Sequence, residues 1–328
     1  MKRNIAIIAG GYSSEHDVSL RSAAGISSWL DRERYNVYLV VIERDSWTAS
    51  DDEGCTAEVN KNDFSFVIAD QRIKPDYAYI TIHGAPGENG ELQGYFDMIG
   101  LPYSTSGVLV EAMTYSKFTT NQYLKTFGVS VAENMVLRRD QRAEVTDEQI
   151  VAAVGLPCFV KPNGGGSSFG TNKVKVIEEL APALDAAFAE GSEVMIEAFM
   201  SGTELTCGCY KTRQRAVVLP PTEVVPQNEF FDYDAKYNGQ VSEITPARIS
   251  ADDTRRVQQL TSAIYDILHT NGIIRVDYIL SPDGKLRMLE VNTTPGMTAT
   301  SFIPQEVAAN GQQMRDVLTE IIENQMGE

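Results

Sequence analysis

The sequence predicts a mixed α/β protein, with an N-terminal parallel sheet covered by helices and two further regions in which helices and strands mix. Three observations carry this prediction. Apolar runs of strand length alternate with helical spacing over the first third of the chain. The pattern breaks near residues 101–104, after which short strands are bounded by Pro and Gly. The 328 residues are 43% hydrophobic and 22% charged, which is typical of folded domains and sufficient for two or three of them.

The first third of the chain begins with a continuous apolar run. The expected elements are a strand over 4–9, a turn over 10–15, a helix over 19–30, and strands over 37–42 and 77–82. In a parallel sheet, ligands bind beyond the carboxyl ends of the strands. The turn 10–15 and the segment 83–90 both follow strands, so we expect them at the same edge.

The remaining elements fall into two groups. The first group is a helix over 116–127, a strand over 157–162, a Gly/Ser loop over 163–170, a strand over 172–176, a helix over 178–190 and a strand over 193–197. The second group is strands over 204–210 and 215–219, a polar loop over 220–246, a helix over 252–269, a hairpin of 273–280 with 285–291, and a helix over 312–324. We therefore predict domains 1–104, 105–197 and 198–328. A long loop such as 220–246 is usually functional.

Charge and composition exclude several classes of protein. The chain has 28 Lys and Arg against 45 Asp and Glu, a formal net charge of −17. This argues against a nucleic-acid partner, which requires a basic surface, but not against a small phosphorylated ligand. No apolar run reaches the length of a membrane span, and the apolar run at the start is too short for a signal peptide. The four scattered cysteines suggest ordinary thiols, so we expect a cytoplasmic protein without a membrane partner.

The most informative local pattern is the hairpin 273–291. Asp283-Gly284 is a preferred two-residue turn. With this turn, Pro282 pairs with Lys285. The same register places Asp277 opposite Glu290.

The register set by this turn also places Arg275 opposite Asn292. Because side chains alternate along a strand, these two residues lie on the same face as Asp277 and Glu290. Residues 276, 278, 280, 289 and 291 then form an apolar face toward the core.

Two opposed carboxylates and an amide oxygen form a set of ligands that Mg²⁺ prefers, especially beside a phosphate. Like charges directly opposite each other destabilise a sheet unless something neutralises them. The sequence therefore predicts a metal site at Asp277, Glu290 and Asn292. The alternative explanation is a solvated polar face on which Arg275 neutralises the carboxylates.

A Gly/Ser loop follows Lys161. Residues 163–170 match neither the Walker pattern nor the dinucleotide-binding glycine pattern. Glycines nevertheless let backbone N–H groups surround an anion, and Lys161 could reach a phosphate. The alternative is a surface hairpin loop.

Residues 197–204 connect the second region to the third. Backbone groups there could bind an adenine edge, with Phe199 or Met200 against the ring and Glu204 on a ribose hydroxyl. The alternative is an interdomain linker with a core phenylalanine.

Two residues of the first region are further candidates. Glu15, after the first strand, could hold a substrate ammonium group, or it could cap the following helix. His83 at the end of a strand has no single interpretation. Cys207 and Cys209 alternate along a strand and are expected to pack in the core.

Several motifs occur in a characteristic order. They are GGYSSEHDVSL at 10–20, HG at 83–84, GENG at 87–90, KP at 161–162, GSSFG at 166–170, DYDAKY at 232–237, RVD at 275–277 and EVNTTPGMT at 290–298. As a set covering essentially the whole chain, they resemble the D-alanine–D-alanine ligase family of the ATP-grasp superfamily. The resemblance implies an ATP-grasp fold, in which two α+β domains clasp ATP beside the N-terminal domain.

The resemblance also implies a reaction. ATP and the first D-alanine form an acyl phosphate, and the amine of the second D-alanine displaces phosphate to give D-alanyl-D-alanine for peptidoglycan synthesis. Glu15 matches the residue that holds the first ammonium group, linked through Ser167 to Tyr237 of a closing loop that would exclude water. Arg275 matches the cation that stabilises the carboxylate oxygens and the tetrahedral intermediate. Further substrate candidates are His83, Gly296, Ser301 and Phe302.

The nucleotide and metal positions follow in the same way. The matching ATP contacts are Lys117, Lys161, Ser167, Ser168, Glu197, Ala198, Met200, Glu204, Phe230 and Lys236. The matching ligands of two Mg²⁺ ions, with Mn²⁺ as an alternative, are Asp277, Glu290 and Asn292, which agrees with the hairpin argument. The chain departs from the family pattern at Asn89, at Phe302 and in its three consecutive glycines, and none of these is a catalytic position.

Two other functions compete with this interpretation. A sister ligase would accept D-lactate or D-serine as the second substrate, although Tyr237 resembles the dipeptide-forming members. A non-catalytic ATP-grasp protein would bind nucleotide and regulate a partner, but it would be expected to lack the arginine or the metal ligands. A homodimer is the habit of the family.

Overall fold

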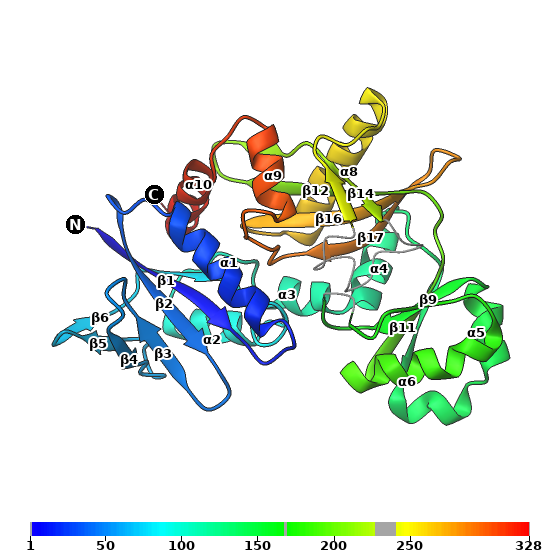
Figure 1. The fold of residues 1–328 in the computed structure, drawn as a ribbon, viewed down its shortest axis with the longest axis horizontal. Coiled ribbons are helices and arrows are strands. Elements are labelled where there is room, and N and C mark those ends of the chain that lie inside the picture. Colours follow the sequence, from blue (N-terminus) through cyan, green and yellow to red (C-terminus); the bar gives the residue numbers. More distant parts are fainter. Residues whose placement is uncertain (1, 167–168, 227–240, 328) are drawn as a thin grey trace.

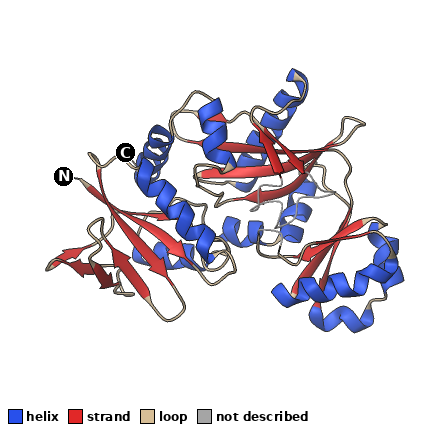
Figure 2. Cartoon of the chain, viewed as in Figure 1, coloured by secondary structure: helices blue, strands red, loops and turns tan. Residues whose placement is uncertain are grey.

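The computed structural model describes residues 2–166, 169–226 and 241–327 (Figure 1). Three main sheets follow one another along the chain, and helices pack on them (Figure 2).

The N-terminal elements are β1 (Arg3–Gly10), α1 (His16–Trp29), β2 (Tyr35–Ile42), β3 (Trp47–Ser50), β4 (Thr56–Glu58), β5 (Phe66–Ile68), β6 (Gln71–Ile73), β7 (Tyr77–Ile80) and α2 (Glu91–Ile99). The main sheet has the order β4-β3-β2-β1-β7. Strands β2, β1 and β7 are parallel, as predicted. The sheet is mixed, because β3 and β4, which the sequence did not predict, are antiparallel to their neighbours. The short connection between β2 and β3 permits only an antiparallel pairing.

Strand β1 is apolar throughout because both of its faces are covered. Ile5 and Ile7 pack in a core shared with α1 and with α10 (Met314–Met326) from the far end of the chain. Ala6 and Ile8 pack in a second core with Phe96 of α2. The C-terminal helix thus completes the N-terminal core, and Figure 1 shows α10 beside α1.

The central elements are α3 (Val108–Tyr115), α4 (Lys117–Thr126), β8 (Asn134–Arg138), η1 (Arg139–Glu144), α5 (Asp147–Val154), β9 (Cys158–Pro162), β10 (Asn172–Val174), η2 (Ile177–Glu179), α6 (Leu180–Glu190) and β11 (Glu193–Ala198). The sheet β10-β9-β11-β8 is antiparallel. Helices α5 and α6 bury its apolar side chains. The predicted start of α4 is confirmed, because the Ser116 side chain caps it by accepting from the Thr119 amide.

The C-terminal elements are β12 (Thr203–Lys211), β13 (Ala216–Val218), β14 (Thr222–Pro226), β15 (Val241–Ile244), α8 (Ala251–Leu268), β16 (Ile273–Leu280), β17 (Leu286–Asn292), α9 (Phe302–Ala309) and α10. The described strands form the order β15-β14-β12-β16-β17, with β13 on β12. The prediction of one loop over 220–246 is therefore wrong at its ends, where β14 and β15 extend the sheet. Cys207 and Cys209 pack in the core, as predicted.

The predicted pairs Asp277–Glu290 and Arg275–Asn292 are found in the β16–β17 hairpin. The turn that leads to this register differs from the predicted one. The turn is one residue longer than predicted, since Ser281 rather than Pro282 faces Lys285 through a 2.9 Å bond from its amide to the Lys285 carbonyl. A bulge between Asp277 and Tyr278 then restores the register.

The same bulge changes which residue of β17 reaches the core. Met288 pairs with Tyr278 and is buried there. Leu289, predicted on the core face, instead lines a cavity on the other face of the sheet.

Candidate active site

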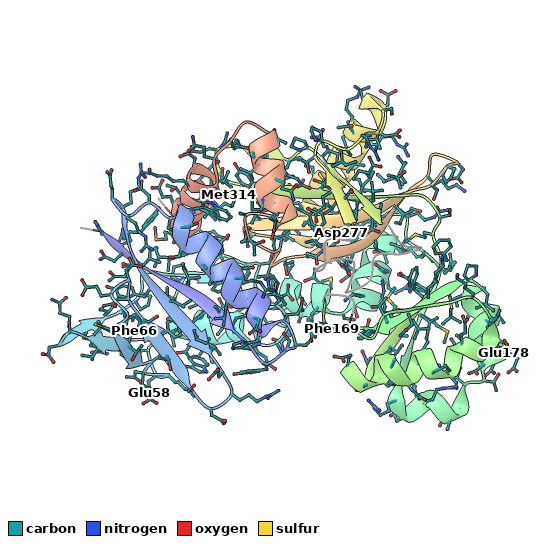
Figure 3. All side chains as sticks on the ribbon, in the orientation of Figure 1. Glu58, Phe66, Phe169, Glu178, Asp277 and Met314 are labelled. Atoms are coloured by element: carbon teal, nitrogen blue, oxygen red, sulfur yellow. The ribbon has the colours of Figure 1, made fainter. Side chains whose placement is uncertain are left out.

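Two adjoining cavities lie where the three sheets approach one another, with volumes of about 390 Å³ and about 430 Å³. We call them the first and second cavity. The residues common to both are Lys117, Gly165, Gly166, Arg275, Glu290 and Phe302. Figure 3 places Asp277 on the C-terminal sheet and Phe169 at the edge of the central part, on either side of this junction.

Every predicted site residue that the structure describes lines one or both cavities. Those of the first cavity alone are Glu15, His83, Asn292, Gly296 and Ser301. Those of the second cavity alone are Lys161, Glu197, Ala198, Met200, Glu204 and Asp277. The predicted residues Ser167, Ser168, Phe230, Lys236 and Tyr237 lie outside the described residues.

Arg275 and Asp277 form the centre of the site. The Arg275 guanidinium donates two 2.8 Å hydrogen bonds to the two oxygens of Asp277. Asp277 also accepts from Thr206 Oγ1 at 2.6 Å and from Asn292 Nδ2 at 3.1 Å. Burial acts to lower the pKa of Arg275, but the Asp277 charge outweighs it and the pKa is raised. The ion pair of the alternative explanation therefore exists, with Asp277 buried and Arg275, Glu290 and Asn292 partly exposed.

Two lysines bring positive charge to the wall between the cavities. Lys161 Nζ lies 2.6 Å from Glu197 Oε1, and both side chains are buried. Burial opposes the charged form of Lys161, but Glu197 and Glu290 raise its pKa. Lys117 donates to the Gly165 carbonyl and lies 4.0 Å from Glu290. Burial lowers the pKa of Lys117.

The second oxygen of Glu197 has no hydrogen-bond partner among the described residues, although it is buried. A buried acceptor without a donor is costly unless a ligand supplies one. The amino group of a purine could do so here, because Ala198, Phe199 and Met200 line the same cavity.

We expect Glu197→Gln to lower the free energy of unfolding by about 3–5 kcal/mol, because it leaves a buried lysine without its counter-charge. Affinity for ATP should fall as well, since Lys161 loses its fixed position. Urea denaturation and ATP titration measure the two effects. The matched control is Glu144→Gln at an exposed position, which should change neither. Unchanged stability of Glu197→Gln would contradict the importance of this pair.

Glu15 enters the first cavity from the N-cap position of α1. Its side chain makes no capping hydrogen bond with described residues and is 6% exposed, so the helix-cap alternative is wrong for this side chain. A Cβ on Gly166 would lie 2.9 Å from a Glu15 oxygen, so a larger residue there would displace the Glu15 carboxylate. His83 lies nearby, with Nε2 3.5 Å from Ser22 Oγ, and burial lowers its pKa.

The predicted subsite for the second amino acid lies at the start of α9. Ser301 occupies the N-cap position, and its Oγ accepts from the Thr298 amide at 3.0 Å. A Cβ on Gly296 would lie 3.0 Å from that Oγ. The Arg275 guanidinium stacks 5.2 Å from the centre of the Phe302 ring. Phe302 therefore contacts Arg275 directly and places it beside this subsite.

Glu111 of α3 binds the loop between β17 and α9 through a buried hydrogen bond. This carboxyl is fully buried, and accepts from the Ser106 amide at 2.9 Å and from Thr293 Oγ1 at 2.6 Å. Burial raises its pKa well above the ordinary value. Sequence analysis did not single out Glu111, because nothing local marks a glutamate in a short helix as buried.

Glu88 is a second residue that sequence analysis passed over, since it appeared only within the GENG motif. Its carboxylate lines the first cavity and accepts from the Gly84 amide at 2.7 Å. Burial and the charge of Glu15 raise its pKa to about 8.

A carboxyl whose pKa is raised on folding stabilises the protein at low pH, and this contribution is lost as the pH rises through the folded pKa. We expect the free energy of unfolding to fall by roughly 1–2 kcal/mol between pH 6 and pH 8 because of Glu88. Urea denaturation at several pH values should show this slope in the native protein and a flatter one in Glu88→Gln. The exposed Glu91→Gln serves as the control and should keep the native slope. An equal slope in all three proteins would rule out this role of Glu88.

The oxygens of Asp277, Glu290 and Asn292 fit a hard divalent cation. Their side chains share one face of the hairpin, and two are carboxylates beside the lysines of the phosphate region. Across the described residues, no group of three or more His, Cys, Asp or Glu could hold a metal, so the site depends on the amide of Asn292 as its third ligand. The hydrogen bonds from Arg275 would compete with a metal for Asp277.

Among the helices that the structure describes, none combines the length and apolar character needed to cross a membrane.

Comparison with known proteins covers both halves of the chain. Residues 4–106 match the family model described as D-ala D-ala ligase N-terminus, and residues 123–323 match the one described as D-ala D-ala ligase C-terminus. The D-alanine–D-alanine ligase of Bacteroides fragilis is 63% identical over 324 residues, which cover 99% of each protein.

Solved structures of related ligases have the same fold as this chain. The VanG D-Ala:D-Ser ligase of Enterococcus faecalis superposes with a TM-score of 0.86 at 30% identity, over 98% of this chain and 99% of that one. The D-alanyl-alanine synthetase A of Vibrio cholerae gives 0.88 at 26% identity, over 100% of this chain and 99% of that one. The predicted ATP-grasp architecture is therefore confirmed.

Proposed function

Because the chain belongs to the D-alanine–D-alanine ligase family and is an ATP-dependent ligase of cell-wall synthesis, we propose how its two cavities share the reaction. The second cavity binds ATP, and the first binds the two D-alanines. The observation that carries this proposal is that the cavities meet at Lys117, Arg275 and Glu290. A phosphoryl group can therefore pass from one to the other.

In the first half of the reaction, the Glu15 carboxylate holds the ammonium group of the first D-alanine, with His83 beside it. The carboxylate of this D-alanine attacks the terminal phosphorus of ATP, and ADP leaves. Lys117 and Lys161 neutralise the phosphates, which is the main requirement of phosphoryl transfer. Glu197, Ala198, Met200 and Glu204 bind the adenosine, with Phe230, Lys236 and Ser168 completing the nucleotide site.

In the second half, the neutral amine of the second D-alanine attacks the carbonyl carbon of the D-alanyl phosphate, and its proton leaves with the phosphate as the amide bond forms. Arg275 stabilises the negative oxygen that forms, and phosphate leaves. Ser301, Gly296 and Phe302 orient the second D-alanine. Ser167 and Tyr237, which lie outside the described residues, have the role of linking Glu15 to the closing loop only as the family resemblance implies it. Two Mg²⁺ ions, held by Asp277, Glu290 and Asn292, would supply further neutralisation of phosphate charge.

The test is phosphate release from Mg-ATP by the purified protein, with product masses read in the same tubes. The arms are D-alanine alone, D-alanine with D-lactate, D-alanine with D-serine, L-alanine, and no amino acid. Phosphate release and a dipeptide mass with D-alanine alone support the proposal. Release only with D-lactate or D-serine would replace it with a sister specificity, and ATP binding without release would indicate a nucleotide-binding regulator.

We also propose that the protein is a cytoplasmic homodimer. The side chains of Met98 and Leu109 are 82% and 74% exposed on α2 and α3, and Val108 beside them is 41% exposed. An apolar surface of this kind is typical of protein contacts. Light scattering after gel filtration measures the mass. A monomer at micromolar concentration would contradict the proposal.

A further inference from the structure

Glu306 is a buried carboxyl that the reaction as described leaves unused. It lies on α9, one turn after Phe302, and its exposed fraction is 0%. Residues four apart lie on the same face of a helix, so Glu306 and Phe302 both face the C-terminal sheet.

The Glu306 side chain fills a gap in that sheet. Strand β12 pairs with β13 from Cys209 onward and with β14 up to Thr206, which leaves Gly208 between the two partners. The Gly208 amide donates to Glu306 Oε2 at 2.7 Å. Thr222 Oγ1 donates to Glu306 Oε1 at 3.1 Å and lies 2.6 Å from Thr245 Oγ1. The carboxyl thus fixes α9 to two strands.

Gly208 is suited to this contact. A Cβ there would lie 2.8 Å from Glu306 Oε2 and 2.6 Å from Ile303 Cδ1, so a larger residue would displace these side chains. On the other side of β12, Gly208 pairs directly with Arg275 of β16. The helix that begins with Ser301 and Phe302 is therefore bonded to the residue beside Arg275.

We propose that Glu306 is a positioning residue, which holds the start of α9, and with it the subsite for the second D-alanine, at a fixed distance from Arg275. The inference rests on the proposed roles of Arg275, Ser301 and Phe302. A positioning role predicts its largest effect on the second D-alanine, because the residues proposed to bind ATP and the first D-alanine lie on other elements, although Phe302 also lines the second cavity.

Burial raises the pKa of Glu306 well above the ordinary value of a glutamate. A glutamine has the same shape and can keep both contacts, since its oxygen accepts from the Gly208 amide and its NH₂ donates to Thr222 Oγ1. An alanine leaves the Gly208 amide without this acceptor, whereas Thr222 Oγ1 keeps its contact with Thr245 Oγ1.

The experiment measures separate KM values for ATP and for the first and second D-alanine in Glu306→Gln, Glu306→Ala and the helix-matched control Asn310→Ala. Asn310 is exposed at the end of α9. We expect Glu306→Ala to raise the KM of the second D-alanine at least about tenfold, the fold-change of losing one hydrogen bond to a buried group. The other KM values should change less than about twofold, and Glu306→Gln and Asn310→Ala should resemble the native protein.

If Glu306→Ala does not fold, Thr222→Val removes one of the two bonds and should raise the same KM about threefold. A folded Glu306→Ala with an unchanged second KM overturns the inference, as does an equal rise in all three values or a defect in Glu306→Gln as large as in Glu306→Ala. If the native protein makes no dipeptide, the proposed function fails. The inference fails by itself when the native protein is active and the second KM does not move.

Discussion

Arg275→Met is expected to lower kcat for dipeptide formation by about 10³-fold while changing the KM for ATP less than about threefold. The guanidinium is the cation placed between the two cavities, and its loss removes stabilisation that is needed only when charge develops on the reacting oxygens. Removing one such donor typically costs about 10²–10³-fold in kcat. Steady-state phosphate release at saturating D-alanine measures the effect.

Arg275→Lys should also be strongly impaired, because an ammonium cannot form the two parallel bonds to Asp277. Both variants need a stability measurement, since they leave Asp277 buried with Thr206 and Asn292 as its remaining partners. The matched control is Arg287→Met on β17, whose guanidinium bonds Ser281 at 2.7 Å and lines neither cavity. A folded Arg275→Met with native kcat would exclude the arginine from catalysis.

The hairpin shows how far sequence reasoning reaches. The register predicted from an Asp283-Gly284 turn places Asp277 opposite Glu290 and Arg275 opposite Asn292, and both pairs are found. The longer turn shifts the register by one residue, and the bulge shifts it back. The pairing predicted for the end far from the turn is therefore correct, although the predicted turn is wrong. A bulge has no reliable local signal, because it depends on which of Met288 and Leu289 packs better against the helices of the core.

What sequence reasoning missed has a common physical cause. Glu111 and Glu306 are buried and Glu88 is half-buried, whereas a glutamate in a sequence predicts a solvated residue. Their burial depends on contacts between elements far apart in the chain, such as Glu306 with Gly208. Helix α10 in the N-terminal core is a further case, since its apolar spacing predicts a helix but not the sheet that it covers.

The domain boundaries at residues 104 and 197 remain predictions. Shared packing is found near both. Val110 of α3 and Leu124 of α4 pack in the core of the C-terminal sheet, and α10 packs on the N-terminal one. The helices between the sheets thus join parts that the chain order separates, which is how Lys117 and Glu290 come within 4.0 Å of each other.

Glu290→Gln is expected to raise the Mg²⁺ concentration needed for half-maximal activity by at least about tenfold and to lower kcat by about 10²-fold. Glu290 is the better choice for this test than Asp277, because its side chain is 24% exposed and Asp277 is the residue that accepts both Arg275 hydrogen bonds. The amide keeps the shape of the side chain, so the fold should survive. The variant also removes the charge that raises the pKa of Lys117, so an ATP titration without metal must accompany it.

The metal itself can be followed without catalysis. A ligand that binds the folded state raises its stability in proportion to the logarithm of its concentration over its Kd, so Mg²⁺ with ADP should raise the Tm of the native protein more than that of Glu290→Gln. The matched control is Glu178→Gln, at the exposed far end of the central part (Figure 3), which should respond to Mg²⁺ like the native protein. Equal Mg²⁺ dependence of both activity and Tm in all three proteins would mean that Glu290 is not a ligand. The face of the β16–β17 hairpin that carries Asp277 and Glu290 would then serve to hold Arg275 and not to bind a metal.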